Sequence, residues 1–174
     1  MPDRVEDMLR KAMRLSAKNA ELFEQGLAQD EEGPGGEVFE ALRDVEFTVL
    51  ASLEGAERGR ADGEGLAEAG GPDPAEVEEV AGMFAGIAER FSGHEAGAGV
   101  LAAAGAAAEA LQAAVEFHEQ WLEEVEEPDE ERFVEGVLAA ERAMYALLSD
   151  LRAFFEDPEG WSPPEGGDYS LDEE

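Results

Sequence analysis

The chain has no cysteine and very little positive charge. Without cysteine it cannot form disulfide bonds, thiolate nucleophiles, zinc ribbons, rubredoxin-type iron sites or iron–sulfur clusters. Lys11 and Lys18 are the only lysines, and 44 acidic residues outnumber 12 lysines and arginines, which gives a formal net charge of −32. Because such a surface repels phosphate backbones and anionic membranes, we expect neither nucleic acid nor lipid as a partner.

Long apolar runs are also missing. The longest, residues 100–108, ends at Glu109 and is far shorter than the roughly 20 residues that span a membrane. Residues 1–11 contain no apolar run of the kind that a secretory signal peptide needs. We therefore expect a cytoplasmic protein. Its acidic residues are scattered over the whole chain, which favours solubility at high salt over cation storage as their role.

What the chain does have is the composition of a helical protein. Ala, Glu and Leu dominate, and long segments lack proline. Apolar residues recur at three- and four-residue steps in four long stretches, and this spacing predicts bundle helices with one solvent-facing side each. A shorter helix should begin at Pro74, after Asp73 as its cap. The expected helices cover residues 3–29, 37–58, 74–91, 97–126 and 129–156.

These helices should form one domain, residues 1–157. The glycine-rich segment 59–96 is expected to be a long crossover that begins with a linker and carries the short helix. Residues 158–174 form an acidic tail whose prolines and glycines exclude a helix. Within this tail, Trp161 and Tyr169 predict contact with the surface of the bundle.

The second half of the chain repeats the first. VFEALRDVEFTVLASLEGA, residues 38–56, recurs as FVEGVLAAERAMYALLSDL, residues 133–151, with Glu46 aligned on Glu141 at an offset of 95. Each segment follows a longer helical stretch that also matches its counterpart. A repeat of this size predicts a duplicated αα-hairpin. The expected fold class is therefore all-α, a four-helix bundle of two hairpins joined by the long crossover.

This organisation resembles the ferritin-like four-helix fold, and the local pattern is similar to its rubrerythrin-like branch. The similarity lies in the rhythm of small and apolar residues leading to Glu46 and Glu141, and in FFEDPEGW, residues 154–161, before a Gly-rich acidic end. It covers nearly the whole chain except the crossover. The resemblance implies a core with two metal ions, usually iron, held by a Glu from each of two helices and a Glu-x-x-His from each of the other two.

Only part of that ligand set is present. Glu46 and Glu141 match the bridging glutamates of the family and are the candidate metal ligands. Apolar residues occupy the four remaining positions, when the first helices of the two hairpins are aligned at an offset of 94: Val49, Met144, Ala17 and Leu111. We expect Met144 to fill the space that a histidine and a metal ion would otherwise occupy.

The two histidines do not complete the set. Phe91 stands three residues before His94 and Val115 three residues before His118, so the chain has no Glu-x-x-His motif. The carboxylates next to His118 in sequence do not share its helix face, so we expect a surface or packing histidine rather than a ligand. His94 follows a helix end, where an imidazolium would interact favourably with the helix dipole.

Two hypotheses follow. The preferred one is a protein whose di-metal site has degenerated, with no cofactor, acting as a structural or interaction module and forming a homodimer through faces of the bundle. Glu46 and Glu141 would then be neutralised by a proton or by Arg43 and Arg142, and at least one of the two carboxyl groups would have a raised pKa.

The alternative is a di-iron or di-manganese oxidoreductase for iron oxidation and storage or for peroxide reduction. Glu46 and Glu141 would bridge the metals, with Glu21 and Glu116, or Glu109, as substitute ligands one turn from the family positions. Without rubredoxin cysteines it could not receive electrons as a complete rubrerythrin does. A third possibility is a small apolar ligand in the emptied core, for which no residue pattern selects.

Overall fold

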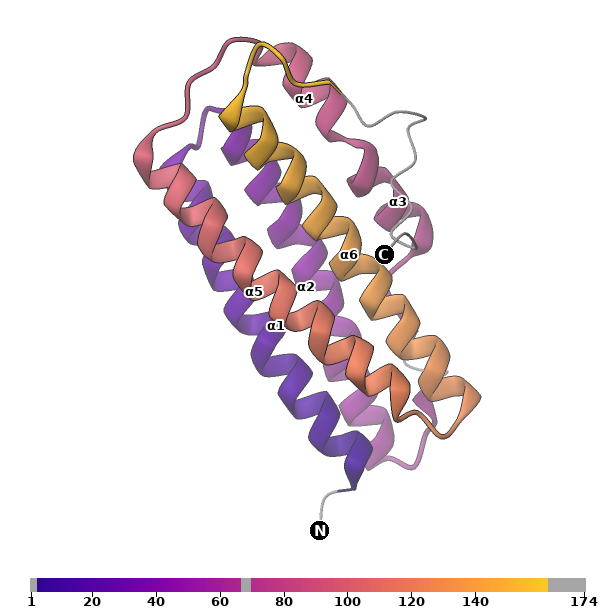
Figure 1. Ribbon diagram of the computed structural model, residues 1–174. Helices are drawn as coiled ribbons and strands as arrows, with labels where there is room; N and C mark the ends of the chain where they lie inside the picture. Colours follow the sequence, from indigo (N-terminus) through magenta and orange to yellow (C-terminus); the bar gives the residue numbers. More distant parts are fainter. Residues whose placement is uncertain (1–2, 67–69, 163–174) are drawn as a thin grey trace.

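The computed structural model describes residues 3–66 and 70–162, and every regular element within these ranges is a helix (Figure 1). The elements in chain order are α1 (Arg4–Gln29), α2 (Pro34–Ala61), α3 (Pro74–Gly82), α4 (Phe84–Arg90), α5 (Ala98–Glu123) and α6 (Pro128–Glu156). The prediction of an all-α protein is confirmed.

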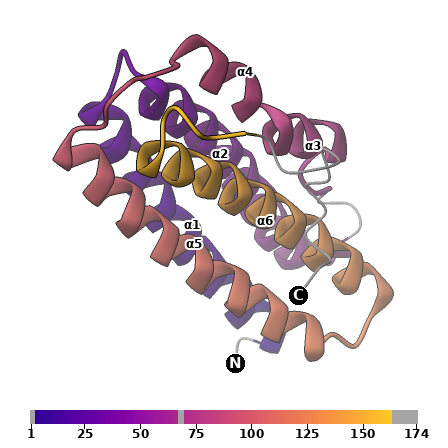
Figure 2. The same cartoon turned by 45° about the horizontal axis from the view of Figure 1, so that its top comes forward.

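Four long helices form the bundle. Helix α1 packs beside α2 and α5, and α6 packs beside α5 and α2. Helices α1 and α6 run in one direction and α2 and α5 in the other (Figures 1 and 2). A rotation of half a turn about an axis perpendicular to the bundle would therefore bring the α1–α2 hairpin onto the α5–α6 hairpin. This arrangement matches the predicted pair of αα-hairpins.

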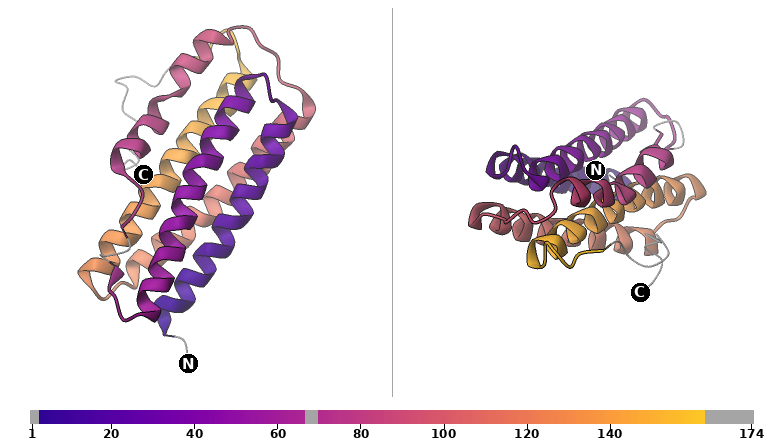
Figure 3. Two further views of the ribbon diagram at one scale, coloured as in Figure 1. Left: turned by 180° about the vertical axis from the view of Figure 1, so that it is seen from behind. Right: turned by 90° about the horizontal axis from the view of Figure 1, so that it is seen from above.

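The crossover returns along the length of the bundle, from the end of α2 to the start of α5 (Figure 3). It carries α3 and α4, which both pack against α6. The single helix predicted at 74–91 is thus two short helices that meet at Met83. The backbone of Met83 stays in a helical conformation, but its N–H group donates to the carbonyl of Val80, three residues earlier, instead of four. The prediction of extra helix in the crossover is confirmed.

Helix α2 begins earlier than predicted. Pro34 occupies the first turn of α2, and the Asp30 carboxylate accepts a hydrogen bond from the Gly35 amide at 2.9 Å. The loop expected between the first two helices, residues 30–36, is therefore shorter than predicted. Pro is favourable in a first helical turn even when glycines follow it.

Trp161 covers part of the crossover. Its ring lies edge-on to Phe84 of α4, with centroids 5.0 Å apart, and Phe84 also meets Phe154 of α6 at 5.6 Å. The predicted contact of Trp161 with the bundle is confirmed. Tyr169, for which the same contact was predicted, lies outside the described residues, as does the tail from residue 163.

Burial repeats at an offset of 95 in both helices of each hairpin. In the first helices, Ser16 and Leu111 are both buried, and Ala17 is exposed. The alignment of Ala17 with Leu111 is therefore wrong by one residue, and Ser16 is the counterpart of Leu111. Further pairs of buried residues at this offset are Leu9 and Ala104, Ala12 and Ala107, Asn19 and Ala114, Phe23 and His118, Leu42 and Val137, Val49 and Met144, Leu53 and Leu148.

Helix α5 is the most apolar of the long helices. Among the described helices it is the one that could cross a membrane by length and composition alone, a property that core helices of soluble bundles share. Here it packs against α1 and α6. Its outer side is built mainly from Ala and Gly, and Leu101 is 45 % exposed there.

Candidate functional site

Five polar side chains from the four long helices are buried in the bundle core. We call them the core polar cluster: Ser16 and Asn19 on α1, Glu46 on α2, His118 on α5 and Glu141 on α6. Each is at most 1 % exposed. Because burying a polar or charged group away from water is unfavourable unless it is paired, their partners decide what the cluster can do.

Glu46 interacts mainly with α1. The Ser16 hydroxyl donates a hydrogen bond to Glu46 Oε1 at 2.5 Å. Burial, reinforced by the negative charge of Glu141, raises the pKa of Glu46 to about 8, against the opposing effect of the neighbouring Ser16 and Asn19 side chains. At neutral pH, Glu46 therefore carries a proton. Its second oxygen, Oε2, is buried and has no hydrogen-bond partner within the described ranges.

His118 pairs with Glu141. Its Nδ1 lies 2.8 Å from Glu141 Oε2 and 2.9 Å from the carbonyl oxygen of Ala114, one turn earlier on α5. The Ala114 carbonyl is the hydrogen-bond partner of Nδ1, whereas Glu141 Oε2 lies close to Nδ1 without a hydrogen-bond partner of its own among the described residues. His118 Nε2 is likewise buried without a partner in the described part of the chain. The imidazole stacks on the Trp121 ring with centroids 5.9 Å apart.

The expectation for His118 was a surface or packing histidine. It is fully buried and packs against Phe117 and Trp121, so the surface alternative is wrong and the packing alternative is confirmed, but its closeness to Glu141 was not predicted. The prediction considered only the carboxylates next to it in sequence, whereas its partner comes from the other helix of the hairpin. One signal in the sequence could have found it: at the offset of 95, His118 corresponds to Phe23, a core aromatic residue.

Neither of the two predicted arginines neutralises the cluster. Arg43 pairs with Asp44 at 3.4 Å, and Arg142 pairs with Glu119 at 2.8 Å. Both guanidinium groups are partly exposed, at 25 % and 27 %, and stay in contact with solvent because burying a cation would cost more than the surface pair gains. The hypothesis of neutralisation by arginine is wrong.

His94, at the opposite end of the bundle from the start of α1, is not part of the cluster. Its Nε2 lies 3.8 Å from Asp30 Oδ1, and its ring meets Phe91 at a centroid distance of 5.9 Å. This places it where the sequence predicted, just beyond the end of α4, and it connects that end to the α1–α2 turn.

The residues in the core do not fit a di-metal centre. Val49, Leu111 and Met144 are fully buried and apolar, and Ser16 offers a hydroxyl in place of a carboxylate. Glu21, Glu109 and Glu116, the predicted substitutes, are exposed on α1 and α5. Within residues 3–66 and 70–162, no group of three or more His, Asp or Glu side chains is arranged to hold a metal ion. Two metals with five or six ligands each need more donors than Glu46, Glu141 and His118 supply.

No protein-family model matches the chain, and no curated protein or solved structure matches it with significance. The chemistry of the cluster must therefore be inferred from the geometry of its residues.

Proposed function

We propose that the protein is a rubrerythrin-like member of the ferritin-like superfamily in which a proton-holding polar cluster has replaced the di-metal centre. It would act as a structural or interaction module without a cofactor. The order of helix directions, with one long crossover between two antiparallel hairpins, supports this proposal because ferritin-like bundles share it. Glu46 and Glu141 support it as well, since they occupy equivalent positions on α2 and α6.

The observation that carries the proposal is the environment of Glu46. In the metal-free core, burial beside Glu141 raises the pKa of this carboxyl group to about 8, so that it holds a proton at neutral pH. Its neighbour on α1 is a hydrogen-bond donor, Ser16, instead of a second ligand. In the family that the chain resembles, metal cations offset the repulsion between the two carboxylates. In this protein, the proton on Glu46 would offset it.

Metal analysis of protein purified after growth with added iron and manganese tests this proposal. We expect the wild type to retain no more metal than the Glu46→Gln variant, because Ser16 and the apolar residues around Glu46 supply too few further ligands. About two irons per chain, the stoichiometry of a di-iron bundle, would refute the proposal.

A metal-dependent oxidoreductase is the second candidate, and one observation favours it. Glu46 Oε2, Glu141 Oε2 and His118 Nε2 are all buried without a hydrogen-bond partner among the described residues, and oxygen and imidazole nitrogen are donors that iron and manganese accept. Under this alternative, Glu46→Ala would abolish metal uptake while Glu54→Ala, an exposed change on the same helix, would leave it intact. Equal uptake by the two variants would count against it.

We further propose that the protein forms a homodimer through the outer face of α5. In a chain with a net charge of −32, copies can approach closely only through surfaces with few charges, and between residues 98 and 115 Glu109 is the only charged side chain.

Light scattering after size exclusion tests the dimer. We expect the wild type to be dimeric and Leu101→Glu to be monomeric, since the new charge would be buried at the interface. Phe47→Glu is the matched control, because Phe47 on α2 is exposed to a similar extent, 47 %. A monomeric wild type, or dissociation by the Phe47 change alone, would contradict an α5 interface.

A further inference from the structure

One stretch of α1 is positively charged in a protein that is otherwise strongly negative. Residues 8–20 contain four of the chain's 12 lysines and arginines, both lysines among them, and no acidic residue. Arg10, Lys11, Arg14 and Lys18 are all exposed, and Ala17 is the only other exposed residue in this stretch. We call the four side chains the α1 cationic stripe.

The charge of the stripe is largely unpaired. Arg10 has a long ion pair with Glu57 of α2, at 3.8 Å, and the Nζ of Lys11 lies 5.0 Å from the centre of the Phe117 ring on α5. Within residues 3–66 and 70–162, Lys11 and the two later cations of the stripe form no ion pair. The stripe is therefore a surface that an acidic partner can approach without repulsion.

Helix α5 lies beside the stripe and runs antiparallel to α1 (Figures 1 and 2). Lys11 is level with Phe117, and near the other end of the pair the Gln29 side chain lies against Gly99. Both helices rise by the same length per residue. Lys18, seven residues after Lys11, is therefore level with the residue seven positions before Phe117, which is residue 110.

Two acidic side chains on α5 match the lysines in height. Glu109 and Glu116 are exposed, and neither forms an ion pair in the described part of the chain. They are seven residues apart, as Lys11 and Lys18 are, which is two helical turns or about 10.5 Å. Glu109 is one residue from the level of Lys18, and Glu116 is one residue from the level of Lys11. The two pairs thus have the same spacing and the same positions along the bundle.

A second copy of the chain can bring these charges together. Half a turn about an axis parallel to the helices keeps every residue at its height and places α1 of each copy against α5 of the other. Half a turn about an axis across the helices would instead place α1 against α1, with the two cationic stripes facing each other. Like charges in contact oppose association, so charge favours the first arrangement.

We propose that the two copies of the homodimer pack α1 of each against the outer face of α5 in the other, with Lys18 paired with Glu109 and Lys11 paired with Glu116. This inference rests on the dimer proposed above and specifies its arrangement. Two-fold symmetry makes every pair occur twice, which gives four ion pairs across the interface. The Ala- and Gly-rich outer face of α5 lets α1 of the other copy approach closely.

Two charge-swapped variants test the arrangement. One carries Lys11→Glu with Lys18→Glu, and the other carries Glu109→Lys with Glu116→Lys. Alone, each variant would bring like charges together at both contacts, and we expect its dimer to dissociate at least about tenfold more readily than the wild type. A mixture of the two has opposite charges at both contacts, so we expect mixing to restore a dimer of about wild-type affinity. Analytical ultracentrifugation at one fixed ionic strength measures the dissociation constants, since salt screens all variants alike.

The matched control is Arg132→Glu with Arg152→Glu. It changes the net charge as much as the lysine variant does, on two exposed side chains of α6, and should dimerise like the wild type. A monomeric wild type would refute the dimer itself. A dimeric wild type whose two swapped variants dimerise normally when alone, stay monomeric when mixed, or weaken no more than the control would refute only this arrangement.

Discussion

The wild-type protein is expected to lose stability as the pH rises, and replacing Glu46 by glutamine is expected to remove most of that loss. Below its ordinary pKa of 4.5, the Glu46 carboxyl group is protonated in both the folded and the unfolded chain. Between 4.5 and about 8, the unfolded chain releases this proton and the folded chain keeps it, so the free energy of unfolding falls as the pH rises. The total is of the order of 3 to 5 kcal/mol, since each pKa unit corresponds to about 1.4 kcal/mol.

The measurement is urea unfolding of both proteins at several pH values between 5 and 9. The difference in unfolding free energy, Glu46→Gln minus wild type, should grow by several kcal/mol toward pH 9. This subtraction cancels the contributions of groups that titrate in both proteins. Asp150 is one of these groups, since burial raises its pKa to about 6. Exposed Glu54 provides the control, because Glu54→Gln should follow the wild type at every pH. If the difference in unfolding free energy does not change with pH, folding does not raise the pKa of Glu46 and the prediction is wrong.

The groups facing Glu46 explain why its proton stays. Ser16 and Asn19 on α1 are neutral donors, and Glu141 on α6 brings a second negative charge. The imidazole of His118 on α5 lies beside the other carboxyl group, with its Nδ1 2.8 Å from Glu141 Oε2.

Replacing His118 by phenylalanine is expected to destabilise the protein by about 3 to 5 kcal/mol at pH 7, the effect of removing one partner from a buried pair. Phenylalanine is the natural choice because Phe23 occupies the equivalent position in the first hairpin. The change leaves Glu141 in the core without the Nδ1 that now lies 2.8 Å from its Oε2. Thermal and urea unfolding measure the loss.

A second substitution separates charge from packing. In the double variant His118→Phe with Glu141→Gln, no buried charge is left unpaired, and we expect most of the lost stability to return. His94→Phe is the control, because its long contact with Asp30, 3.8 Å between two partly exposed side chains, should contribute no more than about 1 kcal/mol. If the double variant is as unstable as His118→Phe alone, the loss comes from the shape of the ring and the pairing argument fails.

The sequence predicted the helices well because their long stretches have a helix-forming composition without internal proline, and α1 in addition has a strong apolar period from Leu9 to Phe23. The start of α2 was missed because glycines at 35 and 36 are typical of a loop, whereas Pro34 and the Asp30 carboxylate hold them in a helix. The break at Met83 was missed for the opposite reason: the apolar spacing continues across it.

The candidate site was predicted only in part. The repeat predicted Glu46 and Glu141 because the second helices of the two hairpins were aligned at the correct offset of 95. Ser16 was missed through a one-residue error, since the Ala-rich stretches of α1 and α5 align almost equally well at offsets of 94 and 95. His118 was missed because its partner lies on another helix.

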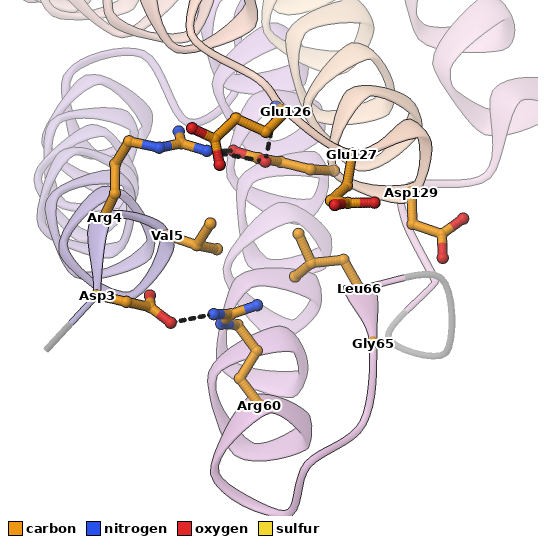
Figure 4. A pocket seen from close by; sticks show the side chains of 10 residues that line it. Asp3, Arg4, Val5, Arg60, Gly65, Leu66, Glu126, Glu127 and Asp129 are labelled. Atoms are coloured by element: carbon orange, nitrogen blue, oxygen red, sulfur yellow. Dashed lines mark hydrogen bonds and ion pairs between the residues drawn. The ribbon is translucent and has the colours of Figure 1, made fainter.

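The cavity at the end of the bundle where α1 and α6 begin (Figure 4) could not have been predicted from spacing. Arg4, Arg60 and Glu130 lie on three different helices and meet only when the bundle closes. Nothing in their immediate sequence distinguishes them from the charged residues on the outer faces, and only the burial of Glu130 shows that they belong together.

Infrared spectroscopy of the protein at pH 7 tests the central claim most directly, because a protonated carboxyl group has a carbonyl stretch that an ionised one lacks. We predict that the wild type shows this band, that Glu46→Gln removes it, and that added iron or manganese leaves it unchanged. A wild type without the band, or a band that disappears when metal is added, would contradict the account.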